Sequence, residues 1–150
     1  MGNDREIEVY KTLRTSQDKY TYFLLAAAGA AIAFAVNQTQ GASMAWSQFP
    51  LAAAIVSLGM SFFFGCRHIN YVASTLYANI ELLKVQSGQH SKVGTHQQLM
   101  AVASEGLMQA MEANTQRANR FGFWQFKLLV TGASLYVIWH VLEMYLRIVA

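Results

Sequence analysis

The sequence predicts an all-α integral membrane protein with three transmembrane helices and a long cytoplasmic helical hairpin between the second and the third. Of its 150 residues, 54% are hydrophobic and only 13% are charged, about half the charged fraction of an ordinary soluble domain. Three apolar runs each approach the roughly 20 residues with which a helix crosses the hydrocarbon core. The segment between the second and third runs is amphipathic with helical periodicity, which predicts the hairpin.

Residues 4–19 are predicted to form a cytoplasmic amphipathic helix. Their charges cancel, so we expect this helix to pack against its own protein, because binding to an anionic lipid surface favours a strongly basic helix. The basic residues of the segment are Arg5, Lys11, Arg14 and Lys19. Its acidic residues are Asp4, Glu6, Glu8 and Asp18.

The first two spans are predicted at residues 20–37 and 49–66. A short loop without charged residues joins them, which predicts an antiparallel pair. Basic residues precede the first span and follow the second at Arg67, and none lies between the two spans. Because basic segments flanking membrane spans stay in the cytoplasm, the N-terminus is predicted to be cytoplasmic.

Small residues recur at every fourth position of the second span, at Ala53, Ser57, Ser61 and Gly65. One interpretation is a tight seam against the first span or a neighbouring subunit, since small residues let membrane helices approach closely. The other is a narrow pore wall lined by Ser57 and Ser61, because polar residues at membrane depth face protein or water rather than lipid. The pattern itself allows both.

Residues 67–120 are predicted to form the cytoplasmic hairpin. Apolar residues continue at helical spacing until Gly88, a turn follows over residues 87–94, and a second amphipathic pattern runs into the third apolar run. A helix pair with an apolar seam, attached to short spans, predicts a homo-oligomer, and we expect a tetramer.

The third span, predicted at residues 124–148, carries a polar stripe. Tyr136, His140, Glu143 and Arg147 follow one another at steps of three or four residues and therefore share a face. One interpretation is a Glu143–Arg147 ion pair near the outer interface, with His140 hydrogen-bonded inside the bundle. The alternative is that the stripe faces an aqueous path or fixes subunit register.

No pattern of catalytic residues is present. The sequence has no paired-carboxylate site, no nucleophile with its base, no HExxH or CxxC motif and no glycine-rich phosphate loop. The histidines lack the spacing of metal ligands. We therefore expect no enzymatic activity, no metal site and no cofactor.

Basic residues gather where the predicted hairpin meets the membrane, and the positive-inside rule by itself accounts for such a cluster. In a symmetric oligomer the cluster would also surround one axis and form an electropositive vestibule for a phosphate-rich ligand. Tyr71, Tyr77, Phe121 and Trp124 could offer stacking faces for bases. The predicted vestibule residues are Arg67, His68, Arg117, Arg120 and Lys127.

The layout as a whole resembles the SLATT-type membrane effectors of bacterial nucleotide signalling and anti-phage defence, including the channel subunit of Hailong-like systems. The shared features are a short N-terminal helix, two spans (Tyr20 to Val36 and Phe49 to Cys66) joined by a small loop, and a second span that continues into long cytoplasmic helices. The resemblance is architectural and covers residues 4 to 120; the third span departs from the two-span plan.

The resemblance implies a multi-pass protein of the bacterial inner membrane that forms an oligomeric, normally closed channel. Its ligand would be a nucleotide or DNA oligomer made by a partner nucleotidyltransferase, and channel opening would halt growth. The alternative function is a non-catalytic membrane scaffold or an accessory subunit of a transport complex.

Overall fold

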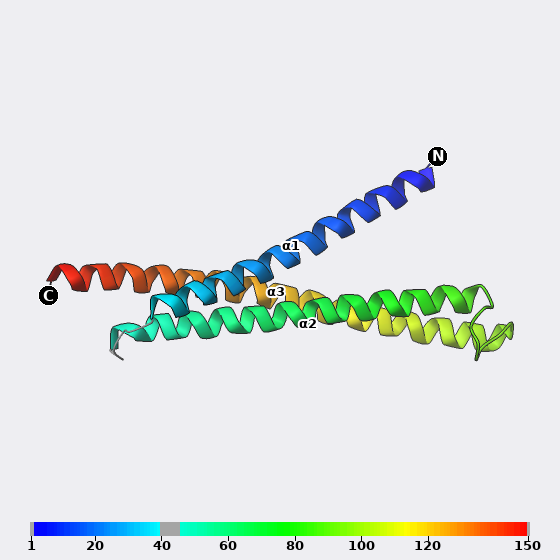
Figure 1. Ribbon diagram of the computed structural model, residues 1–150. Helices are drawn as coiled ribbons and strands as arrows, with labels where there is room; N and C mark the ends of the chain where they lie inside the picture. The colour runs from blue at the N-terminus through cyan, green and yellow to red at the C-terminus, as the bar shows by residue number, and fades with distance from the viewer. Residues whose placement is uncertain (1, 40–45, 150) are drawn as a thin grey trace. The chain divides into compact units, whose positions relative to one another are not determined.

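The structure is a computed structural model that describes residues 2–39 and 46–149 and, within these ranges, all side chains except those of residues 2–7, 10, 147 and 149. Most of the described residues are helical, and none of them forms a strand. They form α1 (Gly2–Gln38), a short 3-10 helix η1 (Trp46–Gln48), α2 (Phe49–Gln86) and α3 (Gln97–Val149) (Figure 1). The all-α class is confirmed, and three helical segments are long and apolar enough to cross a membrane: Lys11–Gln38, Trp46–Gln86 and Gln97–Leu146.

Each long helix contains two of the predicted segments. α1 contains both the predicted amphipathic segment and the first span, while α2 and α3 each join one span to one arm of the hairpin. Pro50 lies in the first turn of α2, where its missing N–H leaves no helical hydrogen bond unmade. At the other end, Gly88 follows α2 with a φ of 71°, a left-handed conformation that favours glycine and stops the helix.

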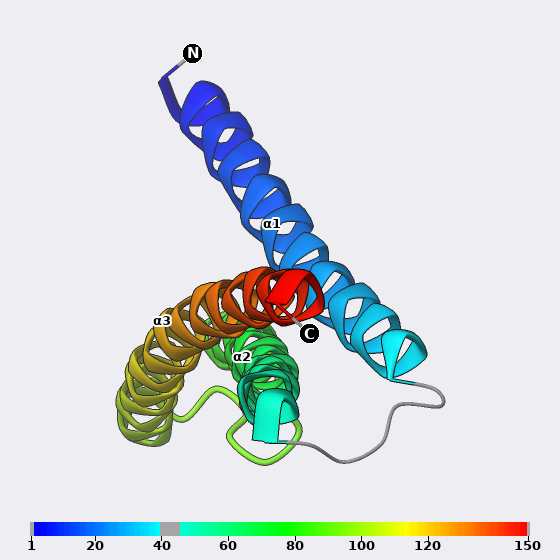
Figure 2. The ribbon, with the colours of Figure 1, turned by 90° about the vertical axis from the view of Figure 1, so that its left-hand side faces the viewer.

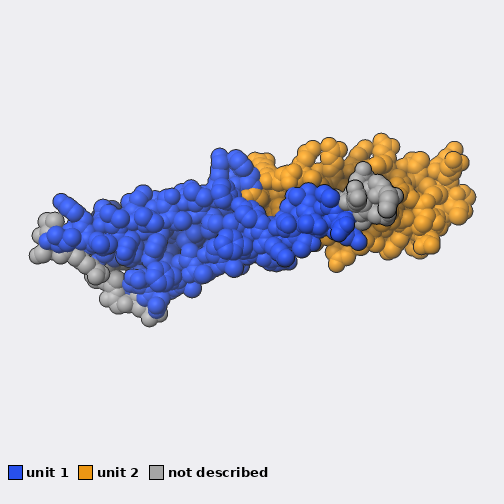
Figure 3. Space-filling view, turned by 90° about the horizontal axis from the view of Figure 1, so that it is seen from above, with its two compact units in different colours: residues 1–65, 123–150 blue, residues 66–122 orange. Residues whose placement is uncertain are grey.

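The chain divides into two compact units (Figure 3). Unit 1 consists of Met1–Gly65 and Phe123–Ala150, and unit 2 consists of Cys66–Gly122. The division falls inside α2 and inside α3, so both helices contribute to both units.

Unit 1 buries small residues where its helices meet and exposes many of its large apolar ones. Ala28 of α1 and Ala54 of α2 are fully buried, and Gly132 of α3 packs so closely on α2 that an added Cβ would lie 2.7 Å from Cγ of Leu58. Large side chains such as Phe63 point outward instead. This inverted distribution is typical of a helix bundle in lipid, where close approach of backbones rather than burial of apolar surface holds the helices together.

The three helices of unit 1 also contact one another through an apolar cluster. Ala35, Leu51 and Trp139 come from α1, α2 and α3 and are all buried. Tyr136 packs beside them, with its ring edge-on to that of Phe34 at 6.1 Å between centroids. The second half of α1 therefore lies against α2 and α3 within this unit (Figures 1 and 2).

Unit 2 is an antiparallel pair formed by the end of α2 and the beginning of α3. Its buried apolar side chains are few: Leu82, Val85 and Ala118. Several residues of the apolar periodicity that predicted the hairpin remain exposed in a single chain. They include Leu76, Ile80, Leu83, Leu99 and Val102.

Candidate functional site

Two arginines of unit 2 lie around one tyrosine. Arg67 comes from α2, one turn before Tyr71, and its Cζ lies 5.3 Å from the centroid of the Tyr71 ring. Arg117 comes from α3, and its Cζ lies 5.8 Å from the same ring. Nη2 of Arg67 also donates a hydrogen bond of 3.1 Å to Oη of Tyr71. Both arginines are exposed, so Tyr71 holds two accessible guanidinium groups from two different helices.

The ring of Tyr71 is itself supported from α3. Phe121 stacks on it with 5.5 Å between ring centroids and an interplanar angle of 12°. The Cζ of Arg67 lies 5.9 Å from the centroid of the Phe121 ring as well. We call the group of Arg67, Tyr71, Arg117 and Phe121 the arginine–aromatic cluster.

His68 packs beside this cluster and joins α2 to α3. Its Nδ1 lies 2.8 Å from the backbone oxygen of Ala118, and because a carbonyl oxygen only accepts, Nδ1 is the donor. The ring sits against Gly122, where an added Cβ would lie 3.2 Å from Nδ1. His68 therefore fixes the two helices to each other, and its Nδ1 is already used.

The acidic side chains of unit 2 interact elsewhere. Glu81 accepts a 2.7 Å hydrogen bond from Lys84, and its other carboxylate oxygen lies 3.6 Å from His90. Glu105 and Glu112 each accept a hydrogen bond from a glutamine one turn later. Among the described residues, no carboxylate forms an ion pair with the guanidinium groups of the arginine–aromatic cluster.

Two predicted vestibule residues, Arg120 and Lys127, are not members of the cluster. Arg120 is exposed on α3 of unit 2, and within the described part of the chain it forms no hydrogen bond or ion pair. Lys127 belongs to unit 1, where its Nζ lies 4.4 Å from the Phe123 ring centroid and 5.8 Å from that of Trp124. Of the five predicted residues, Arg67, His68 and Arg117 are thus brought together.

The two serines of the second span are used in helix packing. Ser61 is fully buried, and its hydroxyl donates a 2.7 Å hydrogen bond to the backbone oxygen of Gln125. Ser57 is 8% exposed and donates a longer bond, of 3.4 Å, to the backbone oxygen of Leu128. Within one copy of the chain, both hydroxyls therefore face α3.

The predicted polar stripe of the third span is divided. Tyr136 packs into unit 1 beside Trp139, whereas His140 is exposed. Glu143 is half-buried. The predicted Glu143–Arg147 pair involves a side chain outside the described residues.

A buried amide of unit 1 was not among the predicted site residues. Gln125 of α3 is 1% exposed, and its side chain fills the space beside Gly65 of α2, where an added Cβ would lie 2.5 Å from Nε2. The same added atom would lie 2.6 Å from Cδ2 of Leu25 in α1. The sequence feature that could have predicted this buried amide is a glutamine within an apolar run, because polar side chains at membrane depth pack between helices.

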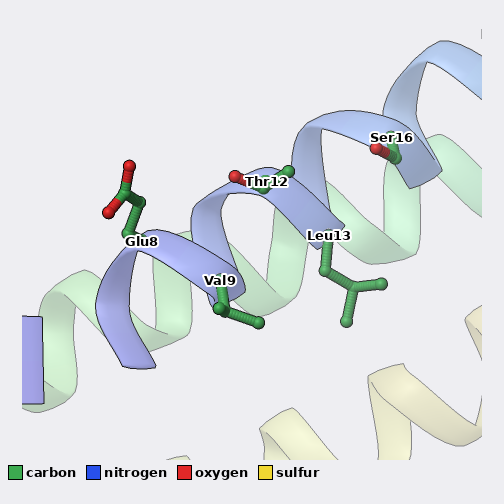
Figure 4. Close-up of a pocket in the computed structure, with 5 residues that line it drawn as sticks. All are labelled: Glu8, Val9, Thr12, Leu13 and Ser16. Carbon is green, nitrogen blue, oxygen red and sulfur yellow. The ribbon is translucent and has the colours of Figure 1, made fainter. Parts of the chain in front are cut away.

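Two open pockets of the described residues lie outside the cluster. One, of about 540 Å³, is lined by residues of α1 alone: Glu8, Val9, Thr12, Leu13 and Ser16 (Figure 4). Val9 and Leu13 point to the same side of the helix. Another, at the beginning of α3, is lined by His96 and the three residues that follow it. Among the described residues, no three histidine, cysteine, aspartate or glutamate side chains gather to hold a metal ion.

Comparison with known proteins finds no matching protein family, curated protein or solved structure.

Proposed function

We propose that the protein is a homo-oligomeric channel or membrane-disrupting effector of the bacterial inner membrane that is gated by a nucleotide or oligonucleotide. In this proposal the N-terminus and unit 2 are cytoplasmic, and the arginine–aromatic cluster receives the ligand. The signal would come from a partner nucleotidyltransferase, and the response would serve anti-phage defence by halting growth.

The observation that carries the proposal is the pair of exposed guanidinium groups without a carboxylate partner among the described residues. Guanidinium groups form their strongest hydrogen bonds with phosphate and carboxylate oxygens. Unit 2 also carries five basic residues against three acidic ones, a net charge of +2 with histidines neutral. Its electrostatics therefore favour an anionic ligand.

Two features support assembly into an oligomer. Apolar side chains remain exposed along the helices of unit 2, outside the predicted spans. On α1, Gly29 has no atom within 4 Å of an added Cβ, so a neighbouring helix has room to approach. We place the conduction path between copies, with four copies as the expected number.

The test is ion flux from liposomes that contain the purified protein. Flux is measured with and without cyclic nucleotides and short DNA oligomers, for the wild type and for the double variant Arg67→Gln/Arg117→Gln. The proposal expects flux that depends on ligand in the wild type and does not depend on it in the double variant. A ligand that prefers the closed arrangement closes the channel, and one that prefers the open arrangement opens it.

Lys92→Gln is the matched control, because it removes one positive charge from the turn of unit 2 and leaves the cluster intact. Its flux should follow that of the wild type. Absence of flux under every ligand condition, together with an unchanged membrane potential in cells that express the protein strongly, would contradict the channel proposal.

A non-conducting scaffold or accessory transport subunit is the second candidate. It is favoured by the hydrogen bonds that both Ser57 and Ser61 make with α3, because these polar groups of the second span are then used in packing. Stable co-purification with a transport ATPase, combined with silent liposomes, would select this function instead.

A further inference from the structure

The rings of the arginine–aromatic cluster are already in contact with other groups. Tyr71 is stacked on Phe121 and is approached by both guanidinium groups. The structure therefore assigns these two rings a supporting role: they orient the arginines, and they are not platforms on which a base stacks. This differs from the sequence-based expectation, which treated Tyr71 and Phe121 as stacking faces.

The arginines are held by contacts that leave donors available. Nη2 of Arg67 donates to Oη of Tyr71, and a guanidinium carries five N–H groups in all. The guanidinium groups of Arg67 on α2 and Arg117 on α3 are held in place by cation–π contact with the Tyr71 ring. A bound anion therefore meets two oriented guanidinium groups. Groups that are ordered before binding lose less conformational entropy when the ligand arrives.

We propose that Arg67 and Arg117, oriented by Tyr71 and Phe121, form a site that recognises the phosphate groups of its ligand without reading the base. This inference rests on the proposed function and narrows it to a ligand class, phosphate chains that carry several negative charges. The shared chemistry is a phosphate oxyanion, which a free polyphosphate, a nucleotide or a phospholipid headgroup can supply.

The test measures binding of three probes to the full chain in nanodiscs of phosphatidylcholine. Inorganic tripolyphosphate and ATP should bind with affinities within about threefold of each other, and adenosine should not bind. Arg67→Gln and Arg117→Gln should each weaken tripolyphosphate binding about tenfold or more, the size expected for losing a charge-assisted hydrogen bond. A clear preference for ATP over tripolyphosphate, or binding of adenosine, would overturn the inference.

Three further variants separate an oriented site from net charge. Tyr71→Leu keeps every charge and removes the ring that both arginines contact, so it should weaken tripolyphosphate binding as an arginine variant does. Lys92→Gln removes one charge away from the cluster, and Tyr77→Ala removes an exposed aromatic ring of α2; neither should change binding more than about twofold. Equal weakening by Lys92→Gln and Arg117→Gln would show attraction to net charge alone and refute the site. Size-exclusion profiles identify any variant that has not assembled. Arg117→Lys keeps the positive charge and removes the planar guanidinium, so it tests the contribution of that group in a chain of unchanged charge.

A second set of nanodiscs, containing phosphatidylglycerol, distinguishes the sources of phosphate. Weaker tripolyphosphate binding in these discs, with the difference abolished by Arg117→Gln, shows that a lipid headgroup competes for the site. Equal binding in both discs shows a site for soluble ligands, and both results support phosphate recognition. Tripolyphosphate binding without any ligand-dependent flux would support the phosphate site and refute the proposed channel. Nucleotide-gated flux that is unaffected by Arg67→Gln and by excess tripolyphosphate would support the channel and refute the phosphate site.

Discussion

Replacing Gly65 by alanine perturbs the point at which α1, α2 and α3 meet in unit 1. The new Cβ would lie 2.5 Å from Nε2 of Gln125 and 2.6 Å from Cδ2 of Leu25, both well inside ordinary van der Waals contact. Gln125 is 1% exposed, so its side chain has no solvent-filled space into which it can turn. The added methyl group must therefore push a neighbouring helix away or force a side chain out of its rotamer.

Two opposing effects set the magnitude. Alanine is better than glycine in a helix interior by about 1 kcal/mol, whereas an extra methyl group in a close-packed interior costs about 1 to 3 kcal/mol. Gly59 lies in the same helix and has no atom within 4 Å of an added Cβ, so Gly59→Ala keeps the helical gain without the clash. Gly65→Ala should accordingly be about 1 to 3 kcal/mol less stable than Gly59→Ala.

The assay is unfolding of the two purified variants in mild detergent by titration with SDS, followed by circular dichroism. Protein concentration is kept equal, since assembly links apparent stability to concentration. If Gly65→Ala proves as stable as Gly59→Ala, the close approach of the three helices at Gly65 is wrong.

Three further outcomes are expected. Gly132→Ala should destabilise the fold by about 1 to 3 kcal/mol in the same titration, because its Cβ would lie 2.7 Å from Cγ of Leu58; unchanged stability would contradict that packing. Ser61→Ala should cost about 0.5 to 1.5 kcal/mol, because it leaves a carbonyl of α3 without its 2.7 Å hydrogen bond; a stabilised variant would contradict this. For the predicted orientation, an impermeant maleimide should label Ser43→Cys, which lies outside the described residues, and should leave Ser91→Cys unlabelled in intact cells. Labelling of Ser91→Cys would refute the predicted orientation.

The amino-acid sequence by itself determined the all-α class and the number of helices long enough to cross a membrane. These properties follow from composition and from the length of apolar runs, because a backbone in hydrocarbon must satisfy its hydrogen bonds within each helix. Local chemistry also determined where α2 stops, since Gly88 supplies the left-handed conformation that ends it. The clustering of basic residues at the ends of the hairpin was visible in the same way.

Tertiary structure alone decided which of these residues meet. Helical periodicity shows that Ser57 and Ser61 share a face of α2. Which residues that face contacts depends on the register of α2 against α3, and close contacts at glycines such as Gly65 and Gly132 set this register. Within unit 2, the packing of the two helices likewise places Arg117 beside Tyr71, 46 residues earlier in the chain. No local pattern encodes a contact of that kind, because it is the sum of many small packing energies along two helices.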